Sequence, residues 1–117
     1  MRKIIVAGNW KMNKTTKETE KFFTEFKPLV EGVKNVEIVI GAPFTALETA
    51  TRETKGTSIK IAAENMNAND SGAYTGEISP LMLKDLGVEY VILGHSERRE
   101  YYGETDSIIN EKVKAAL

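Results

Sequence analysis

The sequence predicts an α/β fold in which a parallel sheet is covered by helices. Short apolar runs rich in β-branched residues recur at a spacing of about 30 residues, which is the size of one strand–helix crossover unit. Amphipathic helical segments separate these runs along the 117 residues. Strands that are joined through helices lie parallel, and a parallel sheet is normally covered by those helices.

The first half of the chain supplies two strand–helix units. Lys3–Gly8 (KIIVAG) has the continuous apolar run of a buried strand, and Thr16–Gly32 follows as a helix. Val36–Gly41 (VEIVIG) is the second strand, and an alanine–proline pair separates it from the helical segment Phe44–Thr54. The apolar residues of the first helix fall on one stripe, formed by Phe22, Phe23, Phe26, Leu29 and Val30.

The second half supplies two more units. Ser58–Ala63 (SIKIAA) is the third strand, and a long polar loop leads from it to a short helix. Ser79-Pro80 is an N-cap and first-turn pair for that helix, and Gly87 closes it. Tyr90–Gly94 (YVILG) is the fourth strand, and Glu104–Leu117 is the last helix. Its predicted inner face consists of Ile108, Ile109, Val113 and Leu117.

Composition excludes several classes of function. The formal net charge is −1 with acids and bases interspersed, which gives no electrostatic footprint for nucleic acid or an anionic membrane. With no cysteine and one histidine, disulfides, thiolate catalysis and the usual zinc sites are excluded. The N-terminal apolar run is too short for a signal peptide, and no segment approaches a membrane span. We therefore expect a cytoplasmic protein without a metal site.

Two sheet architectures satisfy this order of elements: an open doubly wound sheet, and strands that curve into part of a (β/α)8 barrel. The periodicity of the sequence does not distinguish them. In both architectures functional side chains gather at the carboxyl ends of the strands, so we expect a site at these positions.

Two strand ends carry side chains suited to chemistry. Asn9 and Lys11 follow the first strand and can point to the same rim, one offering an amide and the other a cation. His95 follows the fourth strand, and Ser96 and Glu97 can start a helical turn behind it. A helix N-terminus disfavours a positive ring, and a neutral imidazole can polarise a carbonyl oxygen. Each residue alone would more often be structural, but their occurrence at one rim favours a site.

Three stretches closely resemble the triosephosphate isomerase family: AGNWKMN, AENMNANDSGAYTGEISPLMLKDLGVEY and VILGHSERRE. The resemblance runs from the first residue to the last. It implies the parallel (βα)4 half of a TIM (β/α)8 barrel. It also implies interconversion of dihydroxyacetone phosphate and glyceraldehyde 3-phosphate through an enediolate, a reaction of glycolysis and gluconeogenesis, without metal or organic cofactor. The neutral histidine of this family is an established example of a tuned pKa.

The resemblance also implies roles for individual residues. Asn9 and Lys11 bind the triose phosphate substrate, and Lys11 supplies positive charge to the phosphate and the developing oxyanion. His95 is the neutral electrophile that moves a proton between the two substrate oxygens. Glu97 lies near Lys11 as a supporting acid.

A further implication of the resemblance is an interface between subunits. The segment Tyr74–Glu77 of the long loop resembles the part that reaches into a neighbouring subunit in the dimers of this family. There Thr75 steadies the neighbour's Asn9 and Lys11, and Glu77 pairs with Arg98.

The chain departs from its family in extent. The family barrel has eight units in about 250 residues, and four units are present here. No stretch resembles the segment that carries the glutamate base and the start of the lid. Glu97 is not expected to replace that base, since a base must reach the reacting proton and the family places Glu97 behind the lysine.

We therefore expect one half-barrel domain over residues 1–117 that another chain completes. The first hypothesis is a split isomerase, inactive alone and active with a complementary C-terminal half-barrel chain. The second is a non-catalytic protein that self-associates through its open sheet edges, so that two copies close one barrel. A monomer with a flattened sheet is a third and weaker possibility. Four curved strands leave the first and fourth with unpaired backbone groups, which favours association in either form.

Overall fold

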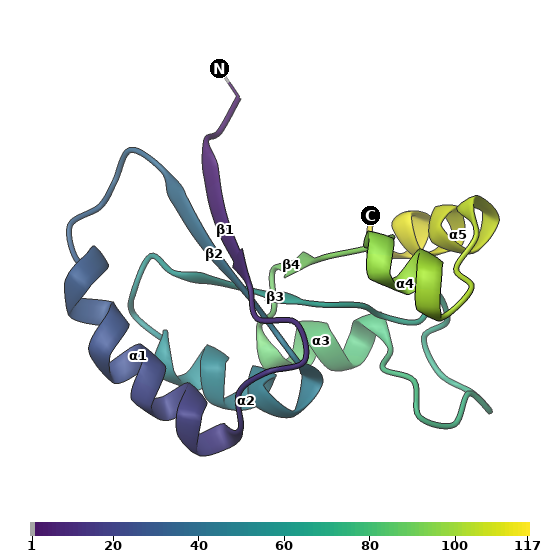
Figure 1. Ribbon diagram of the computed structural model, residues 1–117, viewed down its shortest axis with the longest axis horizontal. Coiled ribbons are helices and arrows are strands. Elements are labelled where there is room, and N and C mark those ends of the chain that lie inside the picture. Colours follow the sequence, from purple (N-terminus) through teal and green to yellow (C-terminus); the bar gives the residue numbers. More distant parts are fainter. Residues whose placement is uncertain (1) are drawn as a thin grey trace.

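Four parallel strands form a single sheet in the computed structural model, which describes residues 2–117 (Figure 1). The strands are β1 (Ile5–Asn9), β2 (Glu37–Ala42), β3 (Lys60–Ala63) and β4 (Tyr90–Val91), in that spatial order. The sheet is not closed, so β1 and β4 are its two edges. The predicted half of a TIM barrel is confirmed, and each strand is followed by a helical connection.

The helices begin where the sequence offers caps. The hydroxyl of Thr15 accepts a hydrogen bond from the backbone N–H of Glu18, and the Glu18 carboxylate accepts from the Thr15 N–H, which forms a capping box. Ser79 caps the third helix in a similar way, and Gly87 ends it in the left-handed conformation. The helices are α1 (Thr16–Val30), α2 (Phe44–Glu53), α3 (Pro80–Leu86), α4 (Ser96–Tyr101) and α5 (Asp106–Ala116).

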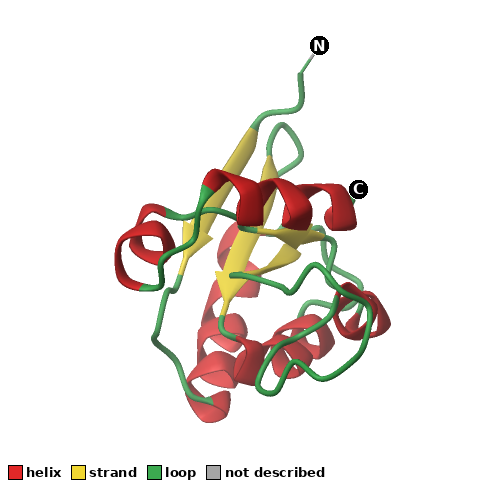
Figure 2. Cartoon of the chain, turned by 90° about the vertical axis from the view of Figure 1, so that its right-hand side faces the viewer, coloured by secondary structure: helices red, strands yellow, loops and turns green. Residues whose placement is uncertain are grey.

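The hydrophobic core lies between β2, β3 and the first two helices. In Figure 2, helices lie behind the strands of the sheet. Alternate residues of the two strands point into it, which is the period of two expected for strand side chains. Phe23 of α1 and Leu47 of α2 fill the space against them and are fully buried. The strand residues of this core are Ile38, Ile40, Ala42, Ile61 and Ala63.

The other face of the sheet shows the curl of a barrel. The hydroxyl of Tyr90 on β4 donates a hydrogen bond to the Glu37 carboxylate on β2, although β3 lies between these strands. At Gly41 an added Cβ would come within 2.9 Å of the Ile92 side chain, so the glycine admits that side chain. Both features bring β2 and the β4 region together over β3.

The prediction that the first strand is buried is wrong for this chain. Ile5 and Val6 of β1 are 46% and 57% exposed. The reason is that β1 pairs only with β2 and that α1 packs mainly against α2. Leu29, predicted to lie on the buried stripe of α1, is also exposed near the end of that helix.

The predicted inner face of the last helix is wrong in large part. Ile108, Val113 and Leu117 are 44%, 40% and 100% exposed, and only Ile109 is partly buried. The buried residue of α5 is Lys112. The helix lies beside the edge strand β4. Among the described residues, no further strand pairs with β4, so nothing covers these side chains of α5.

The fourth strand is shorter than predicted. Its ladder covers Tyr90 and Val91, and one more backbone hydrogen bond, from Ile92 N to Ala63 O at 2.8 Å, continues the pairing. Gly94 then turns the chain with φ +68, a conformation that L side chains rarely adopt. This turn places His95 directly at the start of α4.

Candidate functional site

The carboxyl ends of β1, β3 and β4 surround one open depression of about 540 Å³. The four residues predicted as substrate-binding or catalytic all line it, together with a fifth that the sequence analysis did not select. Its polar and charged lining residues include Asn9, Lys11, Glu64, His95 and Glu97.

Lys11 lies in a turn directly after β1, and its own backbone there has a strained conformation. Its φ is +58, an unusual value for a residue with a side chain. The Lys11 backbone N–H donates to the Asn9 side-chain oxygen at 3.0 Å, which fixes the turn directly after β1. The ammonium then lies 2.7 Å from the Glu97 carboxylate, and both side chains are about half exposed. The hydrogen bond and charge of Lys11 lower the pKa of Glu97.

His95 is the N-cap residue of α4, and its ring orientation follows from that position. Its Nδ1 accepts a hydrogen bond from the backbone N–H of Glu97 at 3.1 Å. An accepting nitrogen carries no proton, so in the neutral ring the proton is on Nε2. This geometry gives the imidazole one free donor, which is the arrangement needed to polarise a carbonyl oxygen.

Glu64 is the site residue that the sequence analysis missed. It follows β3 directly, and its Oε2 is buried without a hydrogen-bond partner. Burial raises the pKa of Glu64 to about 7; the negative charge of Glu97 adds to this rise, and a backbone hydrogen bond from Lys11 opposes it. The signal was available, because an acid at the carboxyl end of the third strand must lie on the same rim as Asn9 and His95.

Nothing in the described part of the chain suggests a metal centre or a membrane segment. In residues 2–117, no group of three or more histidine, aspartate or glutamate side chains could hold a metal ion. None of the helices described is long and apolar enough to cross a membrane.

Comparison with known proteins identifies the family. The family model described as triosephosphate isomerase matches residues 4–117. The chain belongs to the triosephosphate isomerase family. The triosephosphate isomerase of Fusobacterium nucleatum is 60% identical over 117 residues, which are 100% of this chain and 47% of that protein. Those of Dictyoglomus turgidum and Clostridium botulinum (strain Eklund 17B) are 56% and 54% identical over the same shares. The chain therefore spans about half the length of these curated relatives.

The residues expected at a triosephosphate isomerase subunit interface lie outside the depression or at its edge. Thr75 is exposed on the long loop, and the Glu77 carboxylate accepts a hydrogen bond from the Asn67 side chain at 3.0 Å. Arg98 lines the depression, donates to Glu104 at 3.0 Å and stacks over the ring of Tyr102. Within one chain the structure does not bring Glu77 and Arg98 together, so their pairing stays a prediction about two chains.

A buried ionic cluster holds α5 against the base of α4. The Lys112 ammonium donates to the Asn65 side chain at 2.8 Å and to the Glu104 carboxylate, which also accepts from Arg98. Burial opposes the ionisation of Glu104, but the hydrogen bonds from Lys112 and Arg98 outweigh it and lower its pKa. This cluster was not predicted, because Asn65 lies 47 residues from Lys112 in the sequence.

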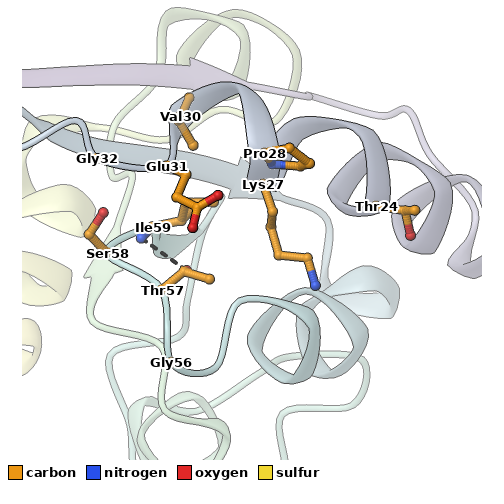
Figure 3. Close-up of a pocket in the computed structure, with 10 residues that line it drawn as sticks. All are labelled: Thr24, Lys27, Pro28, Val30, Glu31, Gly32, Gly56, Thr57, Ser58 and Ile59. Carbon is orange, nitrogen blue, oxygen red and sulfur yellow. Dashed lines mark hydrogen bonds between the residues drawn. The ribbon is translucent and has the colours of Figure 1, made fainter.

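A second depression, of about 600 Å³, lies between the end of α1 and the loop before β3 (Figure 3). Its charged side chains are Lys27 and Glu31, and Lys27 pairs with Glu53 at 3.6 Å. The Thr57 hydroxyl within it accepts a hydrogen bond from the Ile59 N–H and so serves the local turn. No histidine lines it beside this lysine and glutamate, which distinguishes it from the rim site.

Proposed function

We propose that residues 1–117 form one (βα)4 domain, the N-terminal half of a triosephosphate isomerase. This half interconverts dihydroxyacetone phosphate and glyceraldehyde 3-phosphate only together with a C-terminal half-barrel. The observation that supports this proposal is the meeting of Asn9, Lys11, His95 and Glu97 in one depression at the strand ends. The cytoplasmic location, the subunit contacts of Thr75, Glu77 and Arg98, and the absence of any cofactor belong to the same proposal.

In the proposed reaction these side chains stabilise the charge that develops on the substrate. The Lys11 ammonium attracts the phosphate and the oxyanion, and its pairing with Glu97 at 2.7 Å holds it at the rim. The free Nε2–H of His95 donates to the carbonyl oxygen and so favours loss of a proton from the adjacent carbon. The ring then gives its Nε2 proton to one enediolate oxygen and takes the hydroxyl proton from the other. Return of the abstracted proton to the neighbouring carbon by the base completes the shift of the carbonyl by one carbon.

The step that these residues do not perform is the removal of the carbon-bound proton. Glu97 is paired with Lys11, and one carboxylate oxygen of Glu64 is buried. A general base must reach the proton it abstracts. In the proposal the C-terminal half supplies this glutamate, the phosphate-binding loops and the cover that excludes water.

The open sheet supports association with a complementary half. Strands β1 and β4 each have one unpaired edge, and an unpaired edge is a template for a further strand. Exposed Ile4 and Val6 would be covered on closure of a barrel. The same features support the second candidate, a non-catalytic protein in which two copies of this chain associate through their edges.

Complementation tests the two candidates against each other. The chain is mixed with the C-terminal half of the Fusobacterium nucleatum relative, and triose phosphate turnover and native mass spectra are recorded. We expect a one-to-one complex with activity, and no activity in either half alone. His95→Ala should lower kcat on the order of 10²- to 10⁴-fold, as loss of a proton-transfer group does. Glu100→Ala on the exposed side of α4 is the matched control and should leave kcat unchanged.

Two results would contradict the proposal. Robust turnover by the chain alone would show that no second half is needed for proton abstraction. A one-to-one complex without activity would show that the rim residues do not form a working site. Self-association of the chain, with no binding of the C-terminal half, would favour the non-catalytic candidate.

A further inference from the structure

The loop between β1 and α1 has an unusual backbone at two places. Lys11 and Lys14 are the only residues other than glycine with positive φ in residues 2–117, at +58 and +83. Side chains rarely adopt this conformation, and it persists only where the surroundings hold it in place. Lys11 belongs to the rim site, whereas Lys14 has no part in the proposed function.

The side chain of Lys14 is seated on two aromatic rings. Its ammonium lies 5.8 Å from the centroid of the Trp10 ring and 5.7 Å from that of Phe22. Both distances are within the range in which a cation is attracted to the face of a ring. The two rings contact each other edge to face with centroids 5.0 Å apart. Lys14 is partly buried, unlike its neighbours Asn13 and Thr15.

The aromatic platform is itself fixed to the core. The backbone N–H of Trp10 donates to the Gly41 carbonyl at 2.9 Å, which ties it to the end of β2. Phe22 contacts the fully buried Phe23, with centroids 5.1 Å apart. The ammonium of Lys14 therefore rests on a rigid surface. Its charge also contributes to the lowered pKa of Glu18, behind the larger effect of the Thr15 hydrogen bonds.

The loop that presents Lys11 is anchored at both ends. The Asn13 side chain donates to the Trp10 carbonyl at 2.8 Å, and the capping box of α1 begins immediately after Lys14. The side chain of Lys11 is half exposed and has Glu97 as its partner. The direction in which Lys11 leaves the backbone is therefore set by the course of the loop.

We propose that Lys14 is a positioning residue for Lys11. Its ammonium, seated over Trp10 and Phe22, holds the loop in the left-handed turn that aims Lys11 at Glu97. The alternative is that Lys14 stabilises the fold without affecting Lys11. The inference rests on the proposed function only where it concerns turnover, because the Lys11–Glu97 contact lies within this chain.

The two roles are separated by substitutions at one position. Lys14→Gly removes the cation and also relieves the strain, since glycine adopts positive φ freely. Lys14→Met removes the cation and keeps the strain, and Lys14→Arg keeps the cation. Lys17→Met removes an exposed cation from the first turn of α1 and is the matched control.

The readout is the titration of the Glu97 carboxyl, followed by NMR in the chain with each substitution. Glu64 and His95 also face Glu97, so the comparison is made between variants at each pH. We expect the pKa of Glu97 to rise by several tenths of a unit in Lys14→Gly and Lys14→Met. It should keep the wild-type value in Lys14→Arg and Lys17→Met. Lys14→Gly decides the result should Lys14→Met fail to fold.

The same variants are then tested in the complemented enzyme. Lys14→Gly should raise KM and lower kcat/KM about tenfold, since a small displacement of a charged group is enough for such a loss. Unchanged Glu97 titration in folded Lys14→Gly would overturn the positioning role, whatever its thermal stability. If complementation gives no turnover in any variant, the proposed function fails, and the NMR result still decides the role of Lys14.

Discussion

Two regions of the molecule hold the site, and they are built on different physical principles. The first, from β1 to β3 with α1 and α2, has an apolar core containing Phe23 and Leu47. The second, α4 and α5, has no fully buried apolar residue, and Lys112 is the buried residue of its helices. The first region presents Lys11 to the site, and the second presents His95 and Glu97.

The difference suits the tasks of the two regions. Apolar packing stabilises strongly and is not directional, so it fixes a platform. A buried ionic network stabilises little in net terms, but it requires every partner at a defined distance and angle. The cluster of Asn65, Arg98, Glu104 and Lys112, in which Arg98 is the member on α4, therefore fixes the orientation of α4 rather than adding much to the free energy of folding. Substitutions in the apolar region should therefore cause a large loss of stability. Substitutions in the ionic region should displace the residues of the site.

The largest effect is expected in the apolar region. Phe23→Ala removes a fully buried ring and should lower the free energy of unfolding by about 3–5 kcal/mol, which includes the cavity left behind. Leu29→Ala on the same helix removes an exposed side chain and should change it by less than about 0.5 kcal/mol. Urea denaturation followed by circular dichroism measures both. Equal effects of the two substitutions would show that α1 does not pack as described.

A smaller and more local effect is expected in the ionic region. Lys112→Met leaves Glu104 buried with Arg98 as its one ionic partner and should lower the free energy of unfolding by about 3 kcal/mol. The double variant Lys112→Met with Glu104→Gln removes both charges and should be more stable than the single variant. NMR signals of His95 and Glu97 should move in both, because α4 loses its anchor. If those signals stay in place while stability falls, the cluster does not orient α4.

The sequence predicts the order of elements and the rim residues because both depend on local patterns. Apolar runs fix the strands, and positions after strands fix where Asn9, Lys11 and His95 lie. Exposure of β1 and of Ile108 depends on which elements pack against them, and periodicity alone carries no such information. Lys112 was missed for a related reason, since its partner Asn65 is 47 residues away and a lysine on a helix is normally solvated.

Glu64 lies where the two regions meet, near Lys11 of one and Glu97 of the other. Its ionisation should have the smallest effect on stability of the three tests, and the most specific one. In the folded chain its pKa is raised from 4.5 to about 7, chiefly by burial. The folded state therefore binds more protons than the unfolded state between these values, and the free energy of unfolding falls as pH rises through that window. Glu64→Gln has no charge to bury and should escape this fall.

The difference between Glu64→Gln and the wild type should thus grow from near zero at pH 4.5 to a plateau above pH 7. The linkage sets an upper bound of about 3 kcal/mol, and partial exposure of the carboxyl reduces the expectation to about 1–2 kcal/mol. Thermal and urea unfolding from pH 4 to 8 measure it, with Glu48→Gln on α2 as an exposed control. A flat difference would mean that the carboxyl is solvated or finds a donor on ionisation. Glu64 would then join the two regions as an ionised, hydrogen-bonded or solvated carboxylate and not as a buried neutral acid.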